Sequence, residues 1–180
     1  MANNTQIVLE NVRLSYLFAF KPNDNGKYAC AILLPKTDKK AKAALDAAIE
    51  AARLASGPKF NGKVPAKLPT TVYDGDGVRP QDGSEFGPEC KGMWVINASS
   101  GQQPGLVDRR CQTIVDSTQL YSGVWANVDV NFYAYNQNGN RGIACGLNNI
   151  QKVRDDESLG GRSRAQDVFK ALDDDEDLGL

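Results

Sequence analysis

The chain has 180 residues, no histidine and a formal net charge of −1. Its length suits one domain with appendages, and the missing histidine excludes Ser-His-Asp and Cys-His nucleophile systems and Cys/His zinc sites. No apolar run approaches the roughly 20 residues of a membrane span, and the N-terminus is unlike a signal peptide, so we expect a cytoplasmic protein with no cofactor.

The charges are divided unevenly along the chain. Residues 1–154 hold 18 Lys and Arg against 13 Asp and Glu, a net of +5, and residues 155–180 hold 3 against 9, a net of −6. A basic body with an acidic tail favours contact with nucleic acid, although solvated acidic tails also occur elsewhere. We expect a globular domain over residues 1–154 and a charged C-terminal segment over residues 155–180.

A long hairpin is predicted at the N-terminus. Residues 6–20 and 26–34 are apolar and aromatic, and the loop-forming KPNDNG separates them. Alternation along the first strand places Val12, Leu14 and Tyr16 on one face.

One helix is predicted over residues 37–55. Alanine, leucine and isoleucine recur there at three- and four-residue spacing, and Gly57-Pro58 follows as a stop. Thr37 is the expected N-cap, with Asp38 complementing the helix dipole.

The stretch 56–92 is long, irregular and rich in proline and glycine, as functional or disordered loops are. Within it, residues 74–85 superficially resemble a calcium loop. Val78 stands at a ligand position and Arg79 replaces the turn glycine, so we do not expect calcium there.

The remaining strands complete a β-rich domain. We expect a strand over residues 93–98 with Trp94 in the core, an irregular pair within residues 105–115, and a strong strand over residues 123–135. A connection over residues 136–140 then leads to a return strand ending near residue 153. Several strands, one helix and long loops favour a mainly β, OB-type Greek-key barrel over a parallel α/β sheet. The four cysteines form no CxxC pair and are expected to be reduced core thiols, although a disulfide framework stays open.

The strand 123–135 presents aromatic rings on its polar face. Its even-numbered residues are uniformly apolar and belong to a core, whereas the opposite face carries Trp125, Asn127, Asp129, Asn131, Tyr133 and Tyr135. Unpaired bases stack on such rings. Two interpretations remain open: Trp125, Tyr133 and Tyr135 bind single-stranded nucleic acid beside Asn127 and Asn131, or a loop covers them as a second small core.

Basic residues near predicted loops and strand ends are the candidates for contacts with phosphate. They are Arg13, Lys21, Lys27, Lys91, Arg109, Arg110 and Arg141. The sequence does not show which of them lie together.

The C-terminus combines acids with a small hydrophobic end. Asp173, Asp174, Asp175, Glu176 and Asp177 must stay solvated, and Leu178 and Leu180 follow them. This pattern is typical of a partner-binding tail, with a solubilising tail as the alternative.

Three segments resemble a family of bacteriophage single-stranded-DNA-binding proteins. They are LYSGVWANVDVNFYAYNQNGNRGIACGLNNIQKVRDDESLGG (120–161), PTTVYDGDG (69–77) and GMWVINASS (92–100). The resemblance covers most of residues 5–172. It implies an OB fold, sequence-independent binding of single-stranded DNA, and a role in phage replication or recombination in the infected bacterium. It does not rest on a catalytic motif, and we do not expect an enzyme. The acidic tail is similar to those of bacterial and phage single-strand binders, which contact replication or recombination proteins, but it ends in Leu-Gly-Leu rather than an aromatic residue.

Three other functions remain as rivals. A strand-annealing recombinase would form rings or filaments, and a virion structural or decoration protein would have no affinity for DNA. A carboxylate-only nuclease would use Asp74, Asp76, Asp82 and Glu85.

Overall fold

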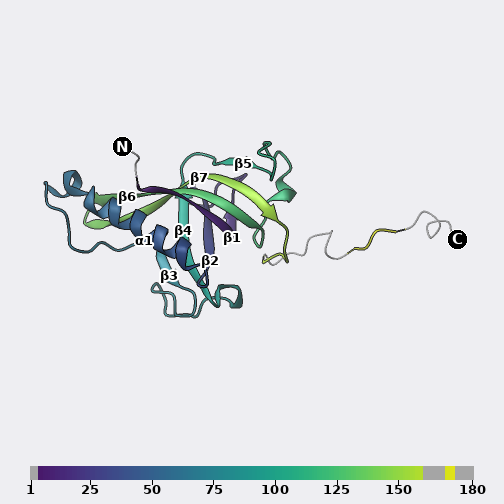
Figure 1. Cartoon of the computed structure of the whole chain (residues 1–180), viewed down its shortest axis with the longest axis horizontal. Helices are drawn as coiled ribbons and strands as arrows, with labels where there is room; N and C mark the ends of the chain where they lie inside the picture. The colour runs from purple at the N-terminus through teal and green to yellow at the C-terminus, as the bar shows by residue number, and fades with distance from the viewer. Residues whose placement is uncertain (1–3, 160–168, 173–180) are drawn as a thin grey trace.

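The computed structural model describes residues 4–159 and 169–172, in which seven strands form one sheet in the order β3-β4-β2-β1-β6-β7-β5 (Figure 1). Ser99 of β4 also pairs with Gly146 of β7, which closes β1, β2, β4, β7 and β6 into a barrel. The mainly β, OB-type fold with one helix is confirmed. The strands are β1 (Gln6–Phe18), β2 (Tyr28–Pro35), β3 (Val72–Asp74), β4 (Met93–Ser100), β5 (Gly105–Val107), β6 (Trp125–Gln137) and β7 (Asn140–Arg154). No helix within the described residues is long and apolar enough to cross a bilayer.

The barrel interior is filled by the face of β6 that alternation assigns to the core. Val128 and Val130 are fully buried there, and Phe132 is nearly so. Trp94 is only half-buried and packs against the edge of this core. The ammonium groups of Lys36 and Lys42 lie 4.8 and 4.6 Å from its ring centroid. Trp94 therefore contacts the core and two lysine side chains, and it is not fully inside the core as predicted.

The helix α1 (Lys39–Leu54) packs beside β1 and β6 through a narrow apolar stripe that contains Leu45. Asp38 caps it, because its carboxylate accepts a hydrogen bond of 3.0 Å from the Ala41 amide. The prediction that Thr37 is the cap was wrong by one position, since the helix begins at Lys39 and the cap is the residue directly before it.

The turn between β6 and β7 is shorter than predicted. Asn138 and Gly139 alone connect the strands, with φ of 52° and 83°. Two consecutive positive φ values give the turn whose twist matches that of a hairpin. Residues 136, 137 and 140, expected in the connection, pair within the strands.

The alternation of β1 breaks at a bulge. Its pairing with β2 shifts register between Ser15 and Phe18, and Tyr16 has a φ of 47°. Ser15 is therefore buried and Tyr16 is 60% exposed. The prediction that Tyr16 shares one face with Val12 and Leu14 was wrong, because a bulge inserts a residue and redirects the next side chain.

All four cysteines are free thiols. Cys30, Cys90 and Cys145 are buried as predicted, and burial raises the pKa of Cys30 to about 12. Cys111 is exposed, so the expectation of a core thiol was wrong there. It lies in a loop after β5, where the chain adopts a φ of 61°.

Candidate nucleic-acid interface

A groove crosses the outer face of β1, β2 and β4. It consists of a first hollow of about 270 Å³ and a second of about 320 Å³, which share Tyr16, Ala31 and Asn97. We call these two hollows the aromatic groove. The first is also lined by Tyr73, Arg79 and Phe86, and the second by Phe18, Asn23 and Thr71.

The bulge in β1 gives the aromatic groove its exposed rings. It turns Tyr16 outward, and Phe18 is 40% exposed nearby. Ala31 contributes only a methyl group to the floor, which leaves space above it, and Asn97 offers amide donors and acceptors. Flat rings beside amide groups suit unpaired bases, which stack on one and hydrogen-bond to the other.

Two carboxylates of the segment that resembles a calcium loop, Asp74 and Asp76, anchor the loop beside the groove. Lys36 Nζ lies 2.5 Å from Asp74 Oδ1 and 2.8 Å from Asp76 Oδ2, and the Gly92 amide donates to Asp76 at 3.0 Å. The hydrogen bonds from Lys36 lower the pKa of both carboxyl groups. Both carboxylates are therefore engaged by the ammonium group of the Lys36 side chain. No cluster of metal-ligating side chains occurs in residues 4–159 and 169–172.

A small hairpin rises from that anchored base. Val78 bridges Glu85, and the Arg79 amide donates to the Ser84 carbonyl at 2.7 Å. The Arg79 guanidinium lies 5.3 Å from the ring centroid of Phe86. The hairpin therefore places a cation and a ring along the first hollow.

Trp125 is the first of the predicted stacking residues. It lies at the start of β6, on the outer face of that strand. It is half-buried, its Nε1 donates to Asp156 at 2.8 Å, and the Arg154 guanidinium lies 4.4 Å from its ring centroid. Tyr133 is 44% exposed, and the Lys59 ammonium lies 5.8 Å from its ring centroid. Trp125 and Tyr133 are eight residues apart, which is about 26 Å along a strand, so they do not form one cluster.

The other predicted residues of this face are engaged in different ways. Asn127 donates to Gln151 at 3.0 Å and accepts from the Asn11 amide at 3.0 Å. Asn131 packs against β7, and Tyr135 is half-buried. The amides of this face are thus partly satisfied within the sheet.

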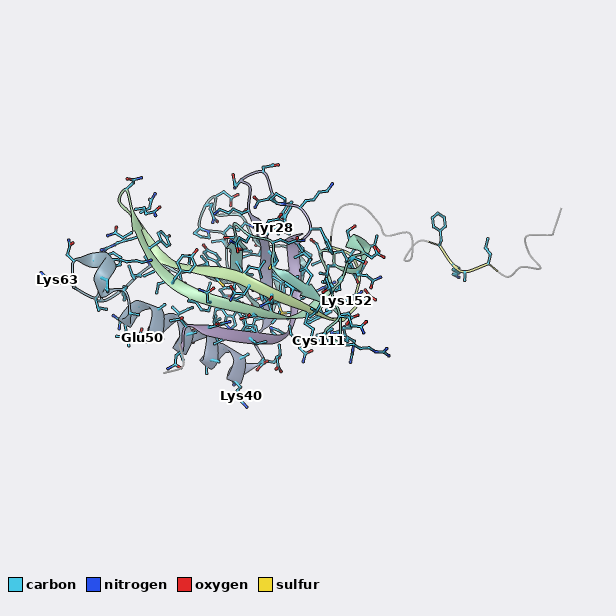
Figure 2. The ribbon with its side chains drawn as sticks, turned by 90° about the horizontal axis from the view of Figure 1, so that it is seen from above. Tyr28, Lys40, Glu50, Lys63, Cys111 and Lys152 are labelled. Carbon is cyan, nitrogen blue, oxygen red and sulfur yellow. The ribbon has the colours of Figure 1, made fainter. Side chains whose placement is uncertain are left out.

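The predicted basic residues fall into separate groups. Arg109 and Arg110 line a hollow of about 370 Å³ with Lys152 and Arg154, which we call the basic hollow. Arg109 also lines a neighbouring hollow with Asn127, so the structure brings these residues to the end of the barrel where Trp125 lies. Figure 2 shows Lys152 and Cys111 at one end and Lys63 at the opposite end.

The remaining basic residues lie elsewhere. Arg141 shares a hollow with Lys63. Lys21 and Lys27 are exposed between β1 and β2, and Lys91 is exposed two residues before β4. Arg13 lies opposite Trp125 in the pairing of β1 with β6, and it donates to the carbonyls of Gly123 and Glu157 at 3.0 and 2.7 Å.

The chain continues past β7 as a strap over the barrel, formed by residues 155–159. The Leu159 amide donates to the Ser122 carbonyl at 2.8 Å. Its side chain packs against a buried cluster that lines the first hollow, formed by Ala31, Leu33, Cys90 and Val95. A Cβ at Gly123 would lie 2.3 Å from the Glu157 carbonyl oxygen, so glycine makes room for the strap. The predicted partner-binding residues 173–180 lie outside the described residues.

Sequence reasoning missed the aromatic groove. Tyr16, Phe18, Tyr73, Phe86 and Arg79 were assigned no binding role. The concentration of aromatic residues in YLFAF, residues 16–20, was a usable signal. The bulge that exposes Tyr16 leaves no such signal, because alternation assumes an unbroken strand.

The chain is similar to phage proteins over most of its length. Residues 5–179 match the family described as Enterobacter phage Enc34, ssDNA-binding protein. The solved single-stranded DNA-binding protein from bacteriophage Enc34 in complex with ssDNA is 28% identical, with a TM-score of 0.72 over 87% of this chain and 90% of that chain.

Two further relatives extend the likeness. Putative protein p50 of Acyrthosiphon pisum secondary endosymbiont phage 1 is 26% identical over 87% of each chain. The gp2.5 single-stranded DNA binding protein of bacteriophage T7 shares the fold, with a TM-score of 0.58 and 14% identity over 90% of this chain and 91% of that chain. By the match over residues 5–179, the chain belongs to the Enc34 ssDNA-binding protein family of phages.

Proposed function

We propose that the chain binds single-stranded DNA along the aromatic groove and coats exposed strands during phage replication or recombination in the infected bacterium. The observation that carries the proposal is the pair of adjoining hollows, with Tyr16 exposed between them on the barrel face that OB folds use for oligonucleotides. Membership of a family of phage ssDNA-binding proteins supports it.

Stacking and charge would act together in this site. Each stacked base contributes about 1–3 kcal/mol and tolerates any sequence, because every base has a flat face. The net charge of +5 on residues 1–154 attracts the phosphate backbone, so affinity should fall as salt rises. We take the binding unit to extend to Leu159, since the strap packs against it.

The β6 face and the basic hollow form a second location for DNA. The observation that favours it is the gathering of Arg109, Arg110 and Arg154 near Trp125. A strand could follow both surfaces in succession. The two locations make different predictions for substitutions at Tyr16 and Trp125.

The deciding experiment is a titration of an unstructured oligonucleotide against a matched duplex, repeated with Tyr16→Ala and Trp125→Ala. We expect the single strand to bind more tightly and Tyr16→Ala to lose about 1–3 kcal/mol of binding free energy, the scale of one stack. A chain that binds neither DNA would contradict the proposal. A loss confined to Trp125→Ala, with stability kept, would move the site to β6.

Three further measurements separate the rivals. Rings or filaments on DNA, seen by sizing, would indicate an annealing protein, and a virion protein would not bind DNA at low salt. Cleavage of DNA with magnesium or manganese would reveal a nuclease, although Asp74 and Asp76 already bind Lys36. Loss of a replication or recombination partner on deletion of residues 173–180 would support the partner-binding tail.

A further inference from the structure

Each of the two hollows of the aromatic groove is lined by a residue that has a buried polar atom without a hydrogen bond. Arg79 Nε belongs to the first hollow and Thr71 Oγ1 to the second, and they are the two such side-chain atoms found in the part of the chain that the structure describes. Buried polar groups are nearly always paired, so an unpaired group requires an explanation. Here both unpaired groups fall in the same groove.

Hydrogen bonds fix the backbone around Thr71, whereas its side-chain hydroxyl has no hydrogen-bond partner. The Thr71 carbonyl accepts from the Asn97 amide at 3.0 Å, which holds the segment against β4. The neighbouring hydroxyl of Thr70 accepts from the Val72 amide at 3.3 Å. Thr71 lines the second hollow, and the χ1 rotation that threonine allows gives its unpaired hydroxyl a way to meet an acceptor there.

Arg79 is held at the first hollow by its ring contact rather than by a carboxylate. Its guanidinium lies over Phe86 and interacts with the Tyr16 hydroxyl. A guanidinium carries five N–H donors in a planar fork, and the Nε–H of Arg79 has no acceptor in the free protein. The Asn97 and Gln81 side chains line the same hollow and supply further hydrogen-bond donors and acceptors.

We propose that the aromatic groove holds two consecutive nucleotides, one in each hollow, with the Tyr16 ring between them. Arg79 donates to the base edge in the first hollow and Thr71 donates to the one in the second. This inference rests on the proposed function. It adds the number of nucleotides that the groove holds and the side chains that form hydrogen bonds with their bases.

The chemistry of the hollows favours bases over phosphates. Rings and small apolar side chains form much of their lining, where a charged phosphate would lose its hydration. Every base offers an acceptor on its minor-groove edge, the purine N3 or the pyrimidine O2. Two donors aimed at that edge therefore bind any sequence.

The test uses Thr71→Val and Arg79→Met in the full chain, with a thermal midpoint and a titration of a thymidine oligonucleotide at two salt concentrations. Thr71→Val removes a hydroxyl that has no partner in the free protein, so the midpoint should stay or rise. The affinity should fall about threefold to tenfold, the scale of one hydrogen bond. Arg79→Met should weaken binding with little change in the salt dependence, because the lost contact is to a base.

Two matched controls separate these effects from general ones. Thr70→Val removes a neighbouring hydroxyl that is already bonded, so it should lower the midpoint and leave the affinity unchanged. Lys40→Met removes one positive charge on α1, where Figure 2 shows Lys40 away from the strands, and should change neither quantity much.

The possible failures are distinguishable. Unchanged affinity in both variants, with tight binding by the parent chain, would overturn the hydrogen bonds and leave the proposed function standing. A lower midpoint in Thr71→Val would show that the hydroxyl is structural. A reduced salt dependence in Arg79→Met would assign Arg79 to a phosphate. Absence of binding by the parent chain would reject the proposed function itself.

Discussion

The indole nitrogen of Trp125 donates a hydrogen bond of 2.8 Å to Asp156, the second residue after β7. Asp156 also lies 3.8 Å from the Arg13 guanidinium and 3.9 Å from that of Arg154. One carboxylate thereby joins the start of β6, the strand β1 and the strap. Trp125 has a structural role in this arrangement, in addition to any contact with DNA.

Replacing Trp125 with Phe should lower the free energy of unfolding by about 1 kcal/mol. A hydrogen bond to a charged group is worth more than that, but the Asp156 side chain is 37% exposed and solvent weakens the interaction. Denaturant unfolding measures the loss, and Asp156→Asn should give a similar value. If the variant is as stable as the parent chain but binds DNA less tightly, Trp125 is a stacking residue, as the sequence predicts.

Acid should weaken the strap through Asp156. The hydrogen bond from Trp125 lowers the pKa of this carboxyl from its ordinary value of 3.8. Its contribution to stability is therefore complete above pH 3.8 and is lost as the pH falls through the lowered value in the folded chain. Comparison with Asp156→Asn isolates this effect, because Asp74 and Asp76 titrate in the same direction. Equal acid sensitivity of both proteins would contradict the assignment.

Gly123→Ala should displace the strap. The new Cβ would lie 2.3 Å from the Glu157 carbonyl oxygen, and the φ of 118° already disfavours any side chain. We expect a loss of about 1–3 kcal/mol in the free energy of unfolding. Gly26→Ala is the matched control, because its φ is 75° but nothing lies within 4 Å of the added Cβ. Equal losses in the two variants would show that the backbone conformation, and not the strap, decides the cost.

The outcomes for β6 and β1 show what the sequence predicts well and what it does not. Alternation assigned the core face of β6 correctly, because that strand pairs on both sides and one face is buried throughout. In β1 the same rule failed at Tyr16. The bulge depends on pairing with β2 and on the open groove beyond it, which are tertiary features.

The candidate site divides in the same manner. Sequence reasoning located aromatic rings on β6 but could not show that Asp156, thirty-one residues later, bonds to Trp125. It likewise could not show that the loop containing Arg79 folds against β2 and β4. Those contacts join segments that are distant in the chain.

Tyr16→Gly should separate affinity from stability. Tyrosine at a φ of 47° is in the left-handed region, which costs about 1–2 kcal/mol for a residue with a Cβ. Glycine removes that cost, so the thermal midpoint should stay or rise while binding to single strands weakens by about 1–3 kcal/mol. Asn11→Gly is the control, because its φ is 53° and it belongs to neither hollow of the aromatic groove. A lower midpoint in Tyr16→Gly would mean that the ring is structural packing.

Deleting residues 173–180 should tighten binding to single strands at low salt. Residues 155–180 have a net charge of −6 and are tethered to a body of net +5. Leu159 packs beside the first hollow, and Asp173 follows it by fourteen positions, which span at most about 50 Å, so we expect the acids to be within reach of the groove. Tethering raises their effective concentration there, and they compete with the phosphate backbone.

Salt provides the signature of this competition. Both attractions are electrostatic, so the advantage of the truncated chain should shrink as salt rises, while DNA still displaces the acids through release of its counterions. A chain of full length, with residues 173–177 changed to Asn or Gln, separates charge from bulk. It should bind DNA as the truncated chain does. If neither variant binds more tightly than the parent chain at low salt, the acids do not compete for the groove, and the tail acts only in solubility or in docking a partner.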